Sequence, residues 1–368
     1  MSFILRPATD RVLDTTIEWD VESTPSGTRA ACSLGEGIRV SAQIKATDLD
    51  ECFFAVGPLH SYPRGETGEP FGIYWLSDSP FDAGALGAKT KALSPRMVKF
   101  FDDPDPTYRV FIRRNIQKCV SGRGQHGGFV YAWTMVVPRD IDEVLIYETV
   151  HNWPRLGHSV GGPTMEEMAD GWFNEGIAEY YSLVLPFRSG IFSGQDFVRR
   201  INIRIPAYYT NPDRTIKNKD VQDRFWVGGH INRIPYQRGF MKRAGARSLD
   251  QLIINMVHPR RQEQPHNIPV WNSMLEKQLG PATETSYQEM SVVLVSVYLR
   301  VVEGLDWTLL RQDQEEFCLG FDEASLSPKG GVVMDLIPTS RVPKQGCRWG
   351  ASLHSSTASS SLKGGAKS

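Results

Sequence analysis

The segment DIDEVLIYETVHNWP, which ends at Pro154, constrains the fold most because it reads as one helix with a chemical pattern along one face. Acidic residues with capping-box spacing begin it and a proline closes it, so we expect a helix over 141–153. Residues three and four apart share a helix face. The helix therefore predicts one face that carries Tyr147, Glu148 and His151.

This face has the spacing of the zinc motif H-E-x-x-H, in which two histidines bind zinc and the glutamate polarises a metal-bound water. Tyr147 stands at the first histidine position. Because a phenol has a pKa of about 10, it is a poor zinc ligand, and we expect weakened metal binding. The simpler interpretations are a core tyrosine at Tyr147 and a buried structural imidazole at His151.

A second helix is expected over GWFNEGIAEYYSLVLP, from Gly171 to Pro186. Glu175 offers a carboxylate on this helix, and three protein ligands plus a water make a catalytic zinc site. Glu179, one turn later, suits an outer position that orients a ligand.

The residues before these helices favour strands. Segments within 15–58, together with 71–80, 108–114 and 127–137, are rich in β-branched and aromatic residues and are bounded by Gly, Pro and Ser. The Gly- and Ala-rich run 82–95 marks a change of composition. Further helices are expected at 250–258 and 286–302.

In chain order, the two helices resemble the pattern H-E-x-x-H-x-W followed by W-x-x-E-G-x-x-x-Y-Y of the glycyl aminopeptidase family of gluzincin metallopeptidases. The matching residues are Glu148, His151, Trp153, Trp172, Glu175, Gly176, Tyr180 and Tyr181. The segments AYYTNP (207–212) and IPYQRGF (234–240) are similar to downstream segments of the family. The resemblance gives Tyr236 the role of stabilising the tetrahedral oxyanion.

The resemblance implies an α+β protein in which a β-rich amino-terminal domain precedes a thermolysin-like, mostly helical gluzincin catalytic domain. The expected parts are a β-rich domain at 1–92, a catalytic domain at 93–305, a short extension at 306–350 and a disordered tail at 351–368. The resemblance does not extend to recognition of a free amine, because the strand GGFVYAW lacks the acidic residue of the larger aminopeptidases.

The function that follows is hydrolysis of peptide or amide bonds by a water that zinc and Glu148 activate. Zinc would be held by His151, Glu175 and, as the poorest ligand, Tyr147; replacement ligands from His126, His158 or His230 compete with their simpler interpretation as surface histidines. Two alternatives stay open. One is an inactive pseudopeptidase that acts as a binding protein, and the other is a small-molecule enzyme that works without metal.

Composition limits the partners. A net charge of −1 offers no broad positive field for nucleic acid, and no stretch is long and apolar enough for a membrane span. The five cysteines are scattered and unpaired in pattern, which predicts reduced thiols and a cytoplasmic location. The expected partner is a peptide or small-molecule substrate. The sequence does not indicate whether the chain is a monomer or an oligomer.

Overall fold

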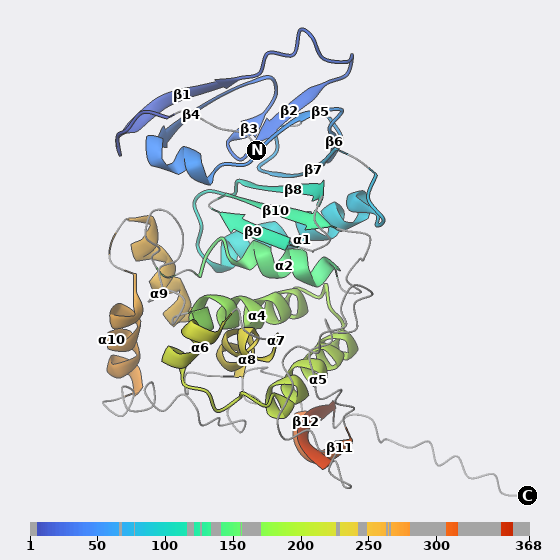
Figure 1. Cartoon of the computed structure of the whole chain (residues 1–368), viewed down its shortest axis with the longest axis vertical. Coiled ribbons are helices and arrows are strands. Elements are labelled where there is room, and N and C mark those ends of the chain that lie inside the picture. The colour runs from blue at the N-terminus through green and yellow to red at the C-terminus, as the bar shows by residue number, and fades with distance from the viewer. Residues whose placement is uncertain are drawn as a thin grey trace, which may run out of the picture. The chain divides into compact units, whose positions relative to one another are not determined.

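The fold is taken from a computed structural model of the chain (Figure 1). The structure describes residues 6–65, 68–76, 78–115, 121–125, 127–133, 141–154, 156, 171–225, 229–241, 249–262, 264, 266–279, 307–315 and 347–355. Two compact units make up the chain. The first comprises residues 1–155 with 181–191, and the second comprises 156–180 with 192–368.

The first unit begins with two small antiparallel sheets. Strand β1 (Val12–Glu18) pairs with β4 (Arg39–Lys45), and β2 (Arg29–Cys32) pairs with both β3 (Gly35–Glu36) and β5 (Phe54–Gly57). The expected antiparallel strands of this region are confirmed. Exposure alternates along β1, as expected for a strand with one covered face.

A mixed five-stranded sheet with the order β6-β7-β8-β10-β9 forms the middle of this unit. Its strands are β6 (His60–Tyr62), β7 (Phe71–Trp75), β8 (Tyr108–Arg114), β9 (Ser121–Gln125) and β10 (Gly128–Trp133). β7, β8 and β10 run parallel to one another, while β6 and β9 are antiparallel edges. Three of these strands lie where the sequence places strands.

The two faces of this sheet are covered by different elements. Alternate residues such as Ile73, Val110 and Tyr131 form one core with helices α1 (Ala83–Phe100) and α2 (Ile141–Val150), which lie against the sheet in Figure 1. The opposite face, including Tyr74 and Phe111, packs with Ala31 of β2. The sheet is therefore buried on both sides, which explains why its parallel strands are almost continuously apolar.

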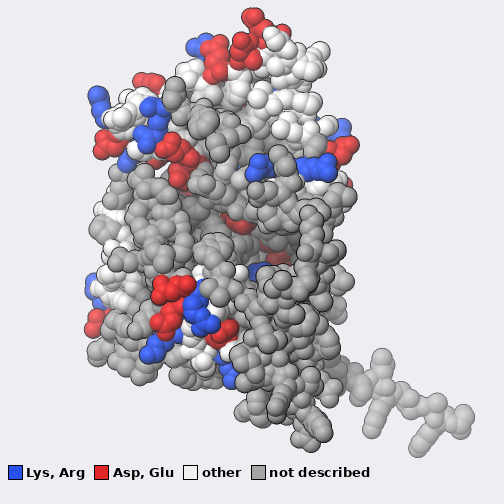
Figure 2. Space-filling model, in the orientation of Figure 1, with Lys and Arg blue, Asp and Glu red and all other residues white. Residues whose placement is uncertain are grey.

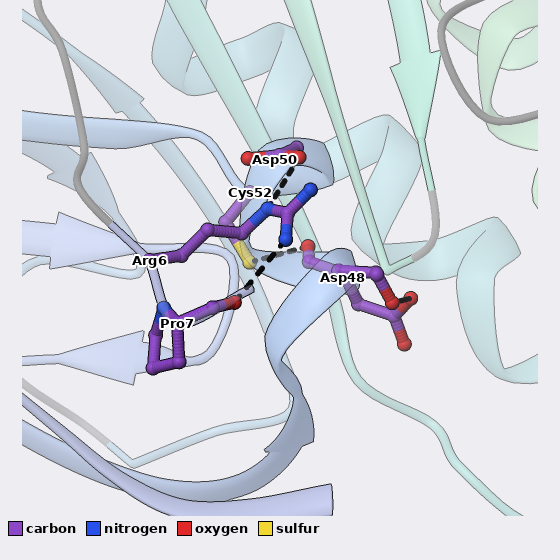
Figure 3. A network of polar contacts seen from close by, with 6 residues as sticks. Arg6, Pro7, Asp48, Asp50 and Cys52 are labelled. Carbon is purple, nitrogen blue, oxygen red and sulfur yellow. Dashed lines mark hydrogen bonds and ion pairs between the residues drawn. The ribbon is translucent and has the colours of Figure 1, made fainter. Parts of the chain in front are cut away.

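A polar network holds the start of the described chain against the short 3-10 helix η1 (Ala46–Glu51) (Figure 3). Arg6 donates from Nε to Asp50 Oδ2 at 2.7 Å, and Cys52 Sγ donates to the carbonyl of Asp48 at 3.6 Å. Burial raises the pKa of the Cys52 thiol to about 12. Cys32, which is fully buried, also has a raised pKa because of burial, so Cys32 and Cys52 are unreactive free thiols near neutral pH.

The second unit is mostly helical. Its elements are the first part of α4 (Gly171–Arg188), then α5 (Gly194–Thr210), α6 (Asn218–Arg224), α7 (Gly229–Asn232), α8 (Ile234–Met241), α9 (Leu249–Arg261) and α10 (Ile268–Leu279), followed by the antiparallel pair β11 (Trp307–Glu315) and β12 (Cys347–Ser355). The last part of α4 belongs to the first unit. A strand-rich first part and a helical second part confirm the predicted α+β class.

Several local expectations differ from the structure. The Gly- and Ala-rich run 82–95, for which the sequence predicts no helix, lies in α1, whose N-cap Asp82 accepts a hydrogen bond from Ala85 N at 2.8 Å. β12 includes the first residues of the tail predicted as disordered. The helix predicted at 286–302 lies outside the described residues, and the predicted domain boundaries stay predictions.

Among the described residues, no helix is long and apolar enough to cross a membrane. Figure 2 shows acidic and basic side chains lying close to one another on the face in view, in keeping with the small net charge of −1.

Candidate functional site

The end of α2 brings two of the predicted site residues into direct contact. Tyr147 and Glu148 are half-buried, whereas His151 is only 8% exposed. The rings of Tyr147 and His151 meet edge to face, with centroids 4.7 Å apart and planes at 85°. α2 ends at Val150 rather than 153, so His151 is the first residue after the helix. The bonds Asn152 N to Thr149 O and Trp153 N to Val150 O replace the last helical turn.

Two hydrogen bonds brace this helix end within the first unit. The hydroxyl of Tyr108 on β8 donates to the carbonyl of Glu148 at 3.3 Å. The amide of Gly127, beside β10, donates to Asn152 Oδ1 at 3.0 Å. The segment that carries Glu148 and His151 is thus tied to the central sheet.

Trp153 anchors the same helix end through two further contacts. Its Nε1 donates to Asp103 Oδ2 at 2.6 Å, and its ring stacks on Phe101 with centroids 4.9 Å apart at 13°. The sequence identifies Trp153 through the H-x-W pattern but gives no sign of its partner Asp103, because the two are distant in sequence. Trp153 therefore positions the helix end through both packing and a charge-assisted hydrogen bond.

The second unit presents Glu175 on the least buried stripe of α4. Between Gly171 and Tyr180 every residue is buried except Gly171, Glu175 and Glu179, which recur every four residues. One helix face thus carries both carboxylates. Asn174, beside Glu175, is 7% exposed and accepts a hydrogen bond from Leu156 N at 2.9 Å.

Glu179 has an ion-pair partner on α5. Arg204 donates to its Oε2 from Nε and Nη2, each at 2.8 Å, and both side chains are about one fifth exposed (21% and 19%). We infer that this carboxylate orders the α4–α5 contact, a role that the sequence alone does not indicate.

Tyr236 lies in the first turn of α8 and is half-buried. The guanidinium of Arg233 lies over its ring, 5.8 Å from the centroid. His230 is in α7, where its carbonyl accepts a hydrogen bond from Asn211 Nδ2 at 2.9 Å. His126 and His158 lie outside the described residues.

The predicted site residues are divided between the two units: Tyr147, Glu148 and His151 are in the first, and Glu175 and Tyr236 are in the second. The contacts described above brace each of these two groups of residues within its own unit.

The donors that the resemblance assigns to zinc differ from the two imidazoles and one carboxylate of the gluzincin pattern. They supply one imidazole, one carboxylate and a phenol, and the phenol ring of Tyr147 packs against the imidazole of His151. Within the described part of the chain, no three His, Cys, Asp or Glu side chains form a group that could hold a metal ion.

Comparison with known proteins gives one match to a family and several to solved structures. Residues 163–227 match the family model of M61 glycyl aminopeptidases. This stretch contains Glu175 and the segment AYYTNP, whereas α2 and Tyr236 lie outside it. A search of curated protein sequences finds no match.

The most informative structural likeness is to an aminopeptidase N family protein from Idiomarina loihiensis, with a TM-score of 0.59 at 12% identity over 77% of this chain. The chain spans only 56% of that protein's length. The leukotriene A4 hydrolase of Saccharomyces cerevisiae is also similar over 76% of this chain and 45% of its own, with a TM-score of 0.44 at 13% identity. The resemblance predicted from the motifs is therefore confirmed as a similarity: residues 163–227 are similar to the M61 glycyl aminopeptidases, and the chain shares its fold with the aminopeptidase N family protein.

Proposed function

We propose that the chain is a metallopeptidase-like hydrolase that cleaves peptide or amide bonds, with Glu148 as the general base and Tyr236 as the oxyanion donor. The observation that carries the proposal is the family match over the helix of Glu175, together with the braced end of α2 that holds Glu148 and His151. Protein hydrolases need this kind of rigid support for their reacting groups.

In the proposed reaction, Glu148 takes a proton from a water whose oxygen attacks the carbonyl carbon. Tyr236 donates a hydrogen bond to the oxyanion, and collapse of the tetrahedral intermediate breaks the C–N bond while the proton passes to the leaving amine. General-base catalysis contributes about 10²–10⁴-fold and an oxyanion donor about 10²–10³-fold. The substrate is a peptide or a small amide.

Zinc held by His151, Glu175 and Tyr147 stays a prediction and is tested separately. We expect its binding to be weak, because one imidazole and a phenol bind zinc more weakly than two imidazoles. When bound in such a site, zinc polarises its water and the carbonyl. A cytoplasmic location likewise stays a prediction.

The Tyr147–His151 contact favours a second candidate, in which the site works or binds without metal. One form is a small-molecule enzyme in which Glu148, His151 and Tyr236 act as acid and base. The other is an inactive pseudopeptidase whose site binds a peptide. The first form retains catalysis that depends on Glu148, and the second does not.

The test is hydrolysis of a library of internally quenched peptides and of aminoacyl p-nitroanilides, with and without added zinc. We expect Glu148→Gln to lower the rate by about 10²-fold or more. Asp142→Asn is the matched control, because Asp142 lies on the same helix in an ion pair with Lys89 at 3.6 Å. Absence of hydrolysis by the native chain in every condition would overturn the proposal and leave the small-molecule enzyme and the binding protein.

A further inference from the structure

The helix that carries Tyr236 is anchored by a buried arginine. Arg238 is 2% exposed, and its Nη2 donates to the carbonyl of Ile216 at 2.6 Å and to that of Arg214 at 3.0 Å. These carbonyls lie in the segment between α5 and α6. One guanidinium therefore holds α8 to a stretch of chain about twenty residues earlier.

A second brace joins the same two regions. Asn211, the C-cap of α5, is 6% exposed and donates from Nδ2 to Gln237 Oε1 at 2.9 Å. Its Oδ1 accepts from Asp213 N at 2.9 Å, which fixes the amide orientation. The segments AYYTNP and IPYQRGF, which are separate in sequence, thus form one hydrogen-bonded assembly.

Arg238 lies in a buried environment beside Tyr208. Burial lowers the pKa of Arg238, and the neighbouring Tyr208, itself 1% exposed, acts in the opposite direction. Both carbonyls accept from the same guanidinium nitrogen, Nη2, so their contacts depend on the reach and plane of this one group. Lysine has a shorter side chain and a tetrahedral ammonium group, so its donors lie elsewhere.

We propose that Arg238, supported by Asn211 and Gln237, is a positioning residue that fixes the direction of the Tyr236 phenol. Residues two apart on a helix point about 200° from each other, so Arg238 holds one side of α8 while Tyr236 occupies the other. The importance of this direction for catalysis rests on the proposed function. A donor displaced by about 1 Å loses much of its value to the oxyanion.

The test is ¹⁹F NMR of the full chain labelled with 3-fluorotyrosine, in which the Tyr236 resonance is assigned by its loss in Tyr236→Phe. We expect Arg238→Lys to shift, broaden or split this resonance and to leave that of Tyr62, in the other unit, unchanged. Gln237→Ala removes only the second brace and should give a smaller change, which provides a readout if Arg238→Lys does not fold.

Arg200→Lys is the matched control, because Arg200 is also buried, at 5% exposed, but lies over the ring of Phe192 at 4.3 Å. An unchanged Tyr236 resonance in Arg238→Lys and Gln237→Ala would overturn the proposal, whatever their melting temperatures. The readout does not need activity, so a chain that hydrolyses nothing but shows the expected NMR change would refute the proposed function alone.

If hydrolysis is measured, a double-mutant cycle gives an independent test. Arg238→Lys should lower kcat by about tenfold in the native background and by less than about twofold in Tyr236→Phe. Equal losses in both backgrounds would show that Arg238 only stabilises the fold.

Discussion

Two buried aromatic side chains of the first unit, Tyr131 and Trp153, differ in whether their polar atom is hydrogen-bonded. The hydroxyl of Tyr131 on β10 is buried and has no hydrogen-bond partner among the residues that the structure describes, and the ring is fully buried. The indole Nε1 of Trp153 is also in a buried side chain, 1% exposed, but has the carboxylate of Asp103 as its acceptor. An unsatisfied buried group costs free energy, whereas a satisfied one contributes to stability.

We predict that Tyr131→Phe leaves the free energy of unfolding unchanged or raises it by about 1 kcal/mol near neutral pH, because it removes an unsatisfied hydroxyl. Burial raises the pKa of Tyr131 to about 12. Since the unfolded tyrosine ionises near pH 10, the native chain loses stability above that pH, and the variant lacks this loss. Urea unfolding at pH 7 and at alkaline pH measures both effects. A clear loss of stability at pH 7 would contradict the prediction.

Trp153→Phe should have the opposite effect. It keeps most of the stacking on Phe101 but removes the donor to Asp103, which we expect to cost about 1–3 kcal/mol. Asp103→Asn keeps an acceptor for the indole and should cost less. Chemical denaturation compares the two variants, and equal stability of Trp153→Phe and the native chain would show that this hydrogen bond is dispensable.

Helix α1 packs closely on the central sheet at a glycine. A Cβ added at Gly87 would lie 2.5 Å from Ile73 Cγ2 and 3.1 Å from Tyr62 Cβ, which is closer than packed atoms allow. Gly87→Ala should therefore destabilise the chain by about 1–3 kcal/mol, although alanine favours helix by about 1 kcal/mol. Gly194→Ala, where nothing lies within 4 Å, is the control and should be neutral or slightly stabilising. Thermal unfolding distinguishes the two.

Helix α5 starts with a capping box between Ser193 and Asp196. Ser193 Oγ accepts from Asp196 N at 3.1 Å, and the carboxylate of Asp196 accepts from Ser193. These hydrogen bonds lower the pKa of Asp196, so its contribution is present above the unfolded pKa of about 4 and is lost as pH falls through the lower folded pKa.

Asp196→Asn should accordingly lower the unfolding free energy at pH 7 by roughly 0.3–1 kcal/mol, a modest value because the group is exposed. The difference from the native chain should shrink as pH falls below about 4. Urea titrations across this range test the sign, and a difference that grows in acid would contradict the assignment.

The elements show how far the sequence predicts the fold. β8 is predicted at its observed bounds. Both faces of this strand are buried, so its sequence contains an apolar run that is easy to recognise. Prolines make the helix ends hard to predict. Local rules would end a helix at proline, but Pro95, Pro186 and Pro206 all lie inside helices. The buried faces of these helices favour continuation more than one missing hydrogen bond opposes it. Such compensation comes from tertiary packing, which no local pattern encodes.

At the scale of the whole molecule, sequence order predicts which residues share a motif but not which groups brace them. The order of Glu148, His151, Glu175 and Tyr236 is readable from short patterns. Asp103 and Asn211, which brace the segments of these residues, and Arg204, which pairs with the neighbouring Glu179, are found only from long-range contacts. The match to the peptidase family begins after α2, the helix in which Tyr147 departs from the zinc motif.

A zinc measurement on designed variants tests whether the two halves of the site act together in the whole molecule. Tyr147→His restores the two-imidazole pattern, and we expect it to bind about one zinc per chain more tightly than the native protein, as measured by elemental analysis and competition with a chelator. Adding Glu175→Ala should then weaken zinc binding by more than the roughly 10–100-fold typical of losing an outer support, because a direct ligand is removed.

Glu179→Ala is the matched control for this experiment, because its carboxylate lies one turn further along α4 and is already paired with Arg204 at 2.8 Å. We expect it to leave the zinc affinity of Tyr147→His within about tenfold. If Glu175→Ala and Glu179→Ala have the same small effect, α4 supplies no ligand and the carried-over ligand set is wrong. If Tyr147→His binds zinc through Glu175 yet hydrolyses no peptide, the metal site is restorable and the divergence from peptidase activity lies in the substrate-binding residues.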